Sequence, residues 1–230
     1  SNLTINGGAT SVFTQAANES YGGNLTITQG IHAQGGFTTA VVGTFSNSGT
    51  LRRKQIETFT GTMDIDSGTV EYVGNGDGVV DTVTITDFGG AGTDYYNLKI
   101  NDANATKDNF SNGAALTVAG TVEVASGTMT QSGSNAIAVT GTMTTNGGTF
   151  AGGSGAMSAG GLFTVSSGAF TATSGTMTLS NSFTFSGGTF THNSGTVVFS
   201  ANANHTITGS VGWNSLTLLD SSDNATDVVL

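Results

Sequence analysis

The chain has neither cysteine nor proline among its 230 residues, so disulfides, thiol nucleophiles and cysteine-based metal sites are excluded. Basic residues are scarce too, with 5 Lys and Arg against 15 Asp and Glu and a formal net charge of −10. Nucleic acids and anionic membrane surfaces both attract basic patches, so neither is an expected partner. No apolar run reaches the ~18 residues of a membrane-spanning helix, and no membrane insertion is expected.

Charge is also missing from one long segment. No Asp, Glu, Lys or Arg occurs between Ser126 and Leu219. A carbohydrate-cleaving β-helix is the enzyme alternative, but it needs acidic groups clustered on one outer face. Four acids in the first half could gather: Glu57, Asp64, Asp66 and Glu71. Their spacing along the sequence does not support a catalytic pair. The sequence therefore predicts a protein that is not an enzyme, with no catalytic residues.

What the chain does have is glycine (36 residues) and an internal repeat of 20 or 21 residues between Val122 and Val197. Each repeat consists of three short segments, with an apolar residue near the start of each and Gly, Ser or Asn at its end. Aligning the repeats gives three apolar columns: Val122, Met143, Phe163 and Phe183; Met129, Phe150, Phe170 and Phe190; Ile137, Met157, Met177 and Val197.

These columns predict a β-solenoid. Apolar and polar residues alternate within each segment, as in a strand with one buried face, and glycines supply the sharp corners. One coil cannot bury its inward face, whereas a stack of coils can. We therefore expect an all-β, right-handed parallel β-helix with triangular coils of about 20 residues and no helices. The chain would form ~11 coils at the strand spacing of ~4.8 Å.

The two halves of the chain differ in regularity. Residues 1–115 are expected to form an irregular solenoid part with longer loops, continuous with a regular part at residues 116–230. Expected inward-facing pairs in the first part include Leu3 with Ile5 and Met63 with Ile65. Long loops are expected from Asp87 to Tyr95 and from Asn101 to Gly113.

A larger repeat lies over the short one. The segment beginning at Ser67 reappears at Ser194, and the segment beginning at Tyr95 reappears at Trp213. The opening residues from Ser1 match the same block, so both ends occupy equivalent places and neither resembles a polar cap. Uncapped strand edges favour further pairing. The expected partners are copies of the chain stacked head to tail, or further repeats of a longer chain. The start at Ser1, without Met, predicts a processed form or a fragment.

The run GTVVFSANANHTITGSVGWNSLTLLD, together with rungs such as LTVAGTVEVASGTMT, resembles the β-strand repeat modules of giant prokaryotic surface proteins. These include autotransporter passengers, filamentous-haemagglutinin-like adhesins and extracellular β-solenoid filaments. The resemblance implies a secreted, fibrous role at a prokaryotic cell surface without catalysis. Surface glycans are a further partner that such a role would allow. The departures are the irregular first half and the lack of an anchor signal.

Calcium is the one cofactor for which the sequence offers a candidate site. Asn75, Asp77 and Asp81 resemble part of a calcium-binding loop, in which carboxylate and amide oxygens converge around a Gly turn. The first acid of such a loop is replaced by Val73, and Thr84 stands where a closing Glu belongs. The alternative interpretation is a simple Asn/Asp/Gly turn between strands.

The only basic cluster is Arg52, Arg53 and Lys54. It could contact the acidic tail of a neighbouring copy, formed by Asp220, Asp223 and Asp227, or an anionic polysaccharide. A solvated loop is the alternative interpretation, because exposed charges contribute little.

Ice binding is a further alternative function. Flat ladders of outward Thr are typical of ice-binding solenoids, which need Thr in every coil. Here the rows mix Thr with Ala, as in the row formed by Thr128, Thr149, Ala169 and Thr189.

Overall fold

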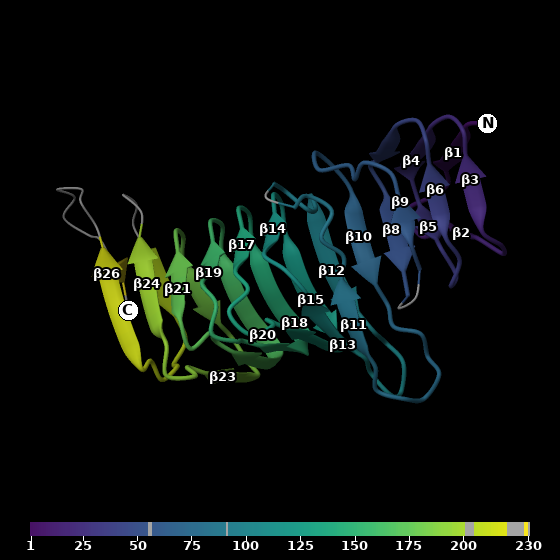
Figure 1. The fold of residues 1–230 in the computed structure, drawn as a ribbon. Helices are drawn as coiled ribbons and strands as arrows, with labels where there is room; N and C mark the ends of the chain where they lie inside the picture. Colours follow the sequence, from purple (N-terminus) through teal and green to yellow (C-terminus); the bar gives the residue numbers. More distant parts are fainter. Residues whose placement is uncertain (55–56, 91, 201–204, 220–227, 230) are drawn as a thin grey trace.

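The computed structural model describes residues 1–54, 57–90, 92–200, 205–219 and 228–229. Over these residues the chain is all-β without helices, and every strand pairing is parallel. The strands stack into a β-solenoid of about 10 turns, which confirms the predicted fold class. Figure 1 shows an elongated molecule with the two termini at opposite ends.

One sheet of 15 strands runs through the whole solenoid. Its main path is β2 (Val12–Thr14), β5 (Ile31–Ala33), β8 (Thr50–Arg53), β10 (Thr69–Tyr72), β12 (Asn97–Asn101), β15 (Val122–Ser126), β18 (Met143–Ala151), β20 (Phe163–Thr171), β22 (Phe183–Phe185), β25 (His205–Thr208) and β27 (Val228–Val229). A branch joins it through β11 (Thr82–Ile85), β13 (Asn109–Asn112), β16 (Thr128–Thr130) and β23 (Thr189–Thr191). The long strands β18 and β20 each cover two sides of the coil.

Three smaller sheets complete the turns. Two of them have three strands and lie in the first half: β1 (Leu3–Asn6), β4 (Leu25–Gln29) and β7 (Phe45–Asn47); β3 (Glu19–Tyr21), β6 (Thr39–Val41) and β9 (Phe59–Thr60). The six-stranded sheet lies in the second half and contains β14 (Leu116–Val118), β17 (Ile137–Val139), β19 (Met157–Ala159), β21 (Thr176–Leu179), β24 (Thr196–Ser200) and β26 (Ser215–Leu219).

The structure places the residues of each predicted column in register. Val122 pairs with Met143, Met143 with Phe163, and Phe163 with Phe183. The second column follows Met129, Phe150, Phe170 and Phe190, and the third follows Ile137, Met157, Met177 and Val197. Eleven of the twelve side chains are buried, and Phe190 is partly buried against the same core. Stacking therefore removes from water the apolar face that a single turn would expose.

Glycine makes the corner between the two halves of β20. Gly168 has φ +77°, and a Cβ atom there would lie 2.0 Å from the carbonyl oxygen of Gly148 in the turn below. Gly188 occupies the same corner one turn later with φ +86°. The left-handed backbone and the close approach of consecutive turns both require glycine at this corner.

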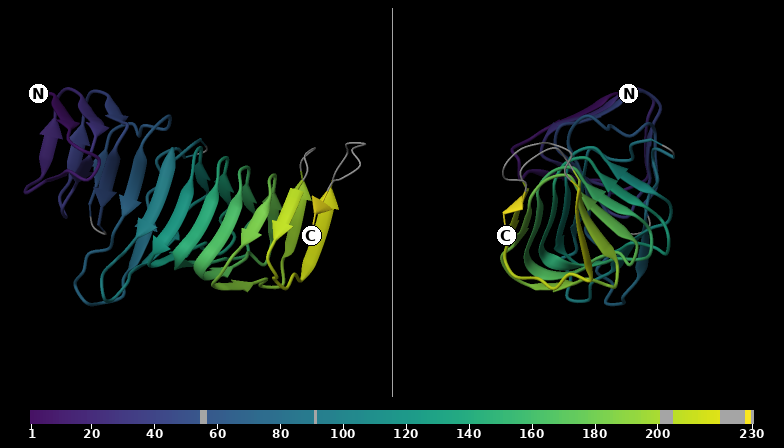
Figure 2. Two further views of the ribbon diagram at one scale, coloured as in Figure 1. Left: turned by 180° about the vertical axis from the view of Figure 1, so that it is seen from behind. Right: turned by 90° about the vertical axis from the view of Figure 1, so that its left-hand side faces the viewer.

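The first half is more regular than its sequence suggests. Its first three turns pair in register, with Leu3 on Leu25 and Leu25 on Phe45. Longer connections follow in the next turns, which is why the chain forms about 10 turns and not ~11. In the axial view of Figure 2 the first turns lie to one side of the later ones.

Two details of the predicted first half are wrong. Met63 is buried, but Ile65 is 45% exposed and belongs to no strand. The Asp64 carboxylate accepts the N–H groups of Asn47 and Asp66, which favours a turn over an extended strand here. The expected loop from Asn101 to Gly113 also contains a strand, β13.

Candidate functional site

Arg53 lies inside the solenoid. It is 3% exposed, and its guanidinium donates to Gln34 Oε1, Tyr72 Oη, Thr86 Oγ1 and the Glu57 carbonyl oxygen. The predicted basic cluster is therefore wrong for Arg53, which cannot contact an external partner. The reason is strand alternation: Leu51 faces inward in β8, so Arg53, two residues later, faces inward as well.

The other two residues of the predicted cluster lie on the outer face. Arg52 Nε donates to Glu71 Oε2 at 2.7 Å, and in the same register row, on the next two strands, Lys99 pairs with Glu123 at 2.9 Å. Burial acts to raise the pKa of Glu123, but hydrogen bonds from Lys99 and Asn146 lower it overall. Lys54 forms no side-chain hydrogen bond or ion pair within the described residues.

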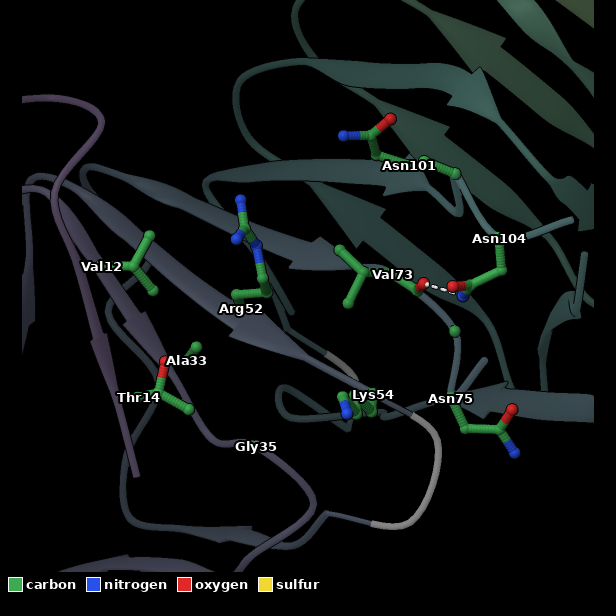
Figure 3. A pocket seen from close by; sticks show the side chains of 12 residues that line it. Val12, Thr14, Ala33, Gly35, Arg52, Lys54, Val73, Asn75, Asn101 and Asn104 are labelled. Atoms are coloured by element: carbon green, nitrogen blue, oxygen red, sulfur yellow. Dashed lines mark hydrogen bonds between the residues drawn. The ribbon is translucent and has the colours of Figure 1, made fainter. Parts of the chain in front are cut away.

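A groove of about 510 Å³ lies on this outer face (Figure 3). It crosses β2, β5, β8, β10 and β12 near the ends where their strands run into loops. Its lining residues are Val12, Thr14, Ala33, Gly35, Arg52, Lys54, Val73, Gly74, Asn75, Asn101, Ala103 and Asn104. They include two cations and no carboxylate, in a chain whose net charge is −10.

A second hollow of about 290 Å³ adjoins the groove and shares Arg52 with it. Its charged residues are the two ion pairs, Arg52 with Glu71 and Lys99 with Glu123, so its charges balance. Because Arg52 is paired with Glu71, Lys54 is the cation of the larger groove that has no ion-pair partner within the described residues.

The candidate calcium residues do come together in one loop. The Asn75 side-chain amide lies 3.0 Å from Asp77 Oδ2 and 3.0 Å from Asp81 Oδ2. Asp77 Oδ1 accepts the N–H of Val79, and Asn75 Oδ1 accepts the N–H of Asp77. The loop is thus closed by its own hydrogen bonds, as in the alternative interpretation of an Asn/Asp/Gly turn.

One buried carboxylate, that of Asp108, fastens this loop to the next turn, and a second holds Asp108 in place. Asp108 accepts the N–H groups of Asn75 and Asp81, and Asp102 accepts the N–H of Asp108. Both Asp102 and Asp108 are buried. Within the described part of the chain, no group of three or more His, Cys, Asp or Glu side chains has the arrangement of a metal site.

The acids considered for an enzyme have separate structural tasks. Glu57 is buried and accepts the N–H groups of Gly36 and Lys54, and its burial raises the pKa of its carboxyl. Asp64 closes a turn, and Glu71 faces outward with Arg52. Each of these three carboxylates thus has a structural contact.

Threonine rows exist on the outer faces, and one of them was not found by sequence reasoning. Thr144, Thr164, Thr184 and Thr208 follow one another in register along the 15-stranded sheet. The rows considered from sequence are in register too, and alanine interrupts them as expected.

The end turns leave inward-facing side chains uncovered. Phe13 is 40% exposed at the N-terminal end, whereas Leu51, two turns further in the same column, is fully buried. Leu218 is 46% exposed at the C-terminal end, although Phe199, with which it pairs, is fully buried. Phe13 and Leu218 are apolar because each belongs to an inward-facing column that continues into the last described turn at its end of the solenoid.

The larger repeat has a structural counterpart at both ends. Strands β1 and β12 share a bulge at the same place, between Ile5 and Asn6 and between Ile100 and Asn101. Asn2 and Asn97, which precede the paired leucines, each accept an N–H from the next turn, at 2.9 and 2.8 Å. Strand β26 pairs with β24 through Leu216 and Val197, as β12 pairs with β10 through Leu98 and Val70.

Two buried histidines were not singled out by sequence reasoning. Within the described residues, neither ring nitrogen of His32 or of His205 has a hydrogen-bond partner. His32 stacks on Phe13 with ring centroids 5.5 Å apart, and burial lowers its pKa to about 4 although Glu19 acts in the opposite direction. The strand alternation around His32 was the available signal for its inward orientation.

Asp220, Asp223 and Asp227, proposed as an acidic contact, lie outside the described residues. Over the part that the structure describes, no helix is long and apolar enough to cross a membrane. Comparisons with protein-family models, curated proteins and solved structures found no match.

Proposed function

We propose that the protein is a non-catalytic structural rod of a prokaryotic cell surface, extended by the stacking of solenoid turns at its ends. The observation that carries the proposal is the exposure of Phe13 and Leu218, which face inward in the two end turns. A further turn placed on either end would bury these side chains, as the interior turns bury theirs. Such a turn would also pair the strand edges that have no partner among the described residues.

The occupant of each end is a second copy or a further repeat of the same kind. In the sequence repeat, strand β1 at one end and β26 at the other match the interior strand β12, which is paired on both of its edges, although the three strands belong to different sheets. Head-to-tail contact through two unlike ends does not close on itself, so it generates a filament or a long fibrous module.

The outer surface suits an extracellular rod. The segment from Ser126 to Leu219 carries no Asp, Glu, Lys or Arg, and its outward positions are mainly Thr, Ser, Ala and Gly. A surface of this kind consists of short side chains and is nearly neutral. The location at a prokaryotic surface rests on the resemblance to β-strand repeat modules.

The proposal is tested by changing the ends and measuring assembly. Sedimentation velocity of the wild type should show species much larger than 22.9 kDa that grow with concentration. Phe13→Lys or Leu218→Lys should leave single chains, because each places a charge in the joint. Val42→Lys is the matched control, since Val42 is 76% exposed away from the stacking column. Single chains for the wild type at all concentrations would contradict the proposal.

A further inference from the structure

The groove on the outer face follows the axis of the solenoid. Its residues come from five successive turns: from strands β2, β5, β8 and β12, and from the segments that directly follow β5, β8, β10 and β12. Four strand spacings of ~4.8 Å give it a length of roughly 19 Å. An open groove of this length fits a segment of an extended polymer better than a compact small molecule.

Hydrogen-bond donors in the groove remain unused within the described residues. Arg52 is bound to Glu71 through Nε, while its two terminal guanidinium nitrogens have no partner. The Lys54 ammonium forms no hydrogen bond within the described residues, although its charge acts to lower the pKa of Glu57, and Figure 3 shows both side chains in the middle of the groove. Arginine and lysine donors bind carboxylate, sulfate or phosphate oxygens most strongly.

Acceptors line the opposite part of the groove. Asn101 uses its amide nitrogen to donate to Glu71, and Asn104 uses its amide nitrogen to donate to the Val73 carbonyl oxygen and to Asp102. Both side-chain oxygens therefore remain available to hydroxyl donors. The lining also includes the small side chains of Ala33, Val73 and Ala103, and Figure 3 shows Val73 between Arg52 and Asn104.

We propose that this groove binds a segment of an acidic polysaccharide. Arg52 and Lys54 would take a carboxylate of the polymer, and the oxygens of Asn101 and Asn104 would accept its hydroxyl groups. Charge supports this occupant, because Lys54 has no ion-pair partner within the described residues and Arg52, although paired with Glu71 through Nε, has its terminal nitrogens left for a second carboxylate. The site lies on the side of the rod, so the inference does not depend on end-to-end stacking.

The test is isothermal titration of the whole chain with alginate oligosaccharides, which are linear oligomers of uronic acids. Lys54→Gln should weaken binding about tenfold through loss of a charge-assisted contact. Lys107→Gln is the matched control: it changes the net charge equally, but Lys107 lies outside the groove and contacts the Asp102 carbonyl oxygen and Ser126. The affinity of Lys107→Gln for the alginate oligosaccharides should stay within about twofold of that of the wild type. Carboxyl-reduced alginate should not bind.

Three outcomes would overturn the inference. The first is no heat with alginate. The second is an equal loss in Lys54→Gln and Lys107→Gln, which would show unspecific attraction to charge. The third is binding of poly-glutamate as tight as that of alginate and equally sensitive to Lys54→Gln, which would assign the groove to an acidic peptide.

Discussion

Phe163 lies directly against Phe183 of the next turn, with ring planes 11° apart and centroids separated by 5.7 Å. Phe150 and Phe170 repeat this arrangement in the neighbouring column at 4.8 Å. Because Phe163 also meets Phe170 edge-on, the two columns form one continuous aromatic core. This core ties successive turns together in the region that carries no charge.

Removing one ring from this core should be costly. Phe163→Ala deletes a fully buried side chain that has neighbours in the turns above and below, and we expect a loss of about 3–5 kcal/mol in unfolding free energy. Thr164→Ala changes the next residue of the same strand, which faces outward, and should cost less than ~1 kcal/mol. Urea unfolding followed by circular dichroism measures both. Similar losses for the two variants would contradict the assignment of faces.

The second prediction concerns the charge inside the first half. Arg53→Met removes the donors for Gln34 and the Glu57 carbonyl oxygen, so buried acceptors lose their partners. We expect a loss on the order of 3 kcal/mol. Arg52→Met, one residue away on the outer face, removes a half-exposed guanidinium from the buried Glu71 carboxylate, which keeps its hydrogen bond from Asn101, and should cost less, about 1–2 kcal/mol. Thermal melting of both variants distinguishes a buried arginine from an exposed one.

The third prediction concerns acid. The pKa of His32 is lowered to about 4 by burial, against an ordinary value of 6.5. The unfolded chain therefore binds a proton below pH 6.5 that the folded chain does not, and stability should fall between pH 6.5 and 4, by up to ~3 kcal/mol. His32→Leu, which matches Leu51 in the same column, should remove this loss. His192→Gln should retain it, since His192 already contacts the Ser194 N–H.

A stability curve for His32→Leu that still falls like that of the wild type over this pH range would show that other groups cause the acid sensitivity.

The fourth prediction concerns calcium. Because Asp77 and Asn75 already accept backbone N–H groups within their loop, millimolar Ca²⁺ should leave the melting temperature unchanged. The free energy of unfolding of Asp81→Asn should then lie within about 1 kcal/mol of that of the wild type, with or without calcium. A calcium-dependent rise in melting temperature that Asp81→Asn abolishes would instead establish the metal site.

The sequence was most informative where turns have equal length. From Val122 to Val197 nearly constant spacing gives the register directly, and the columns follow from it. In the first half, inserted loops such as residues 73–81 break the constant spacing of the repeat. The register there is known from the strand pairing instead, for example from the pairing of Leu3, Leu25 and Phe45. Arg53 was misjudged because a run of three basic residues resembles a solvated loop, although the alternation from Leu51 points inward.

The groove was not predictable from the sequence for a different reason. Its residues come from five turns, and only the three-dimensional arrangement shows that Lys54 and Asn104 share one hollow. The larger repeat, in contrast, was visible in the sequence, and the shared bulge of β1 and β12 gives it a structural basis.

Cryo-electron microscopy of the assembled protein tests the central claim most directly. A rod extended by stacked turns should give fibres with a strand spacing of ~4.8 Å along the axis. About 10 turns per copy should add a subunit repeat of roughly 48 Å. Single particles of one chain length, or fibres whose copies meet side by side with both end turns exposed to solvent, would contradict it.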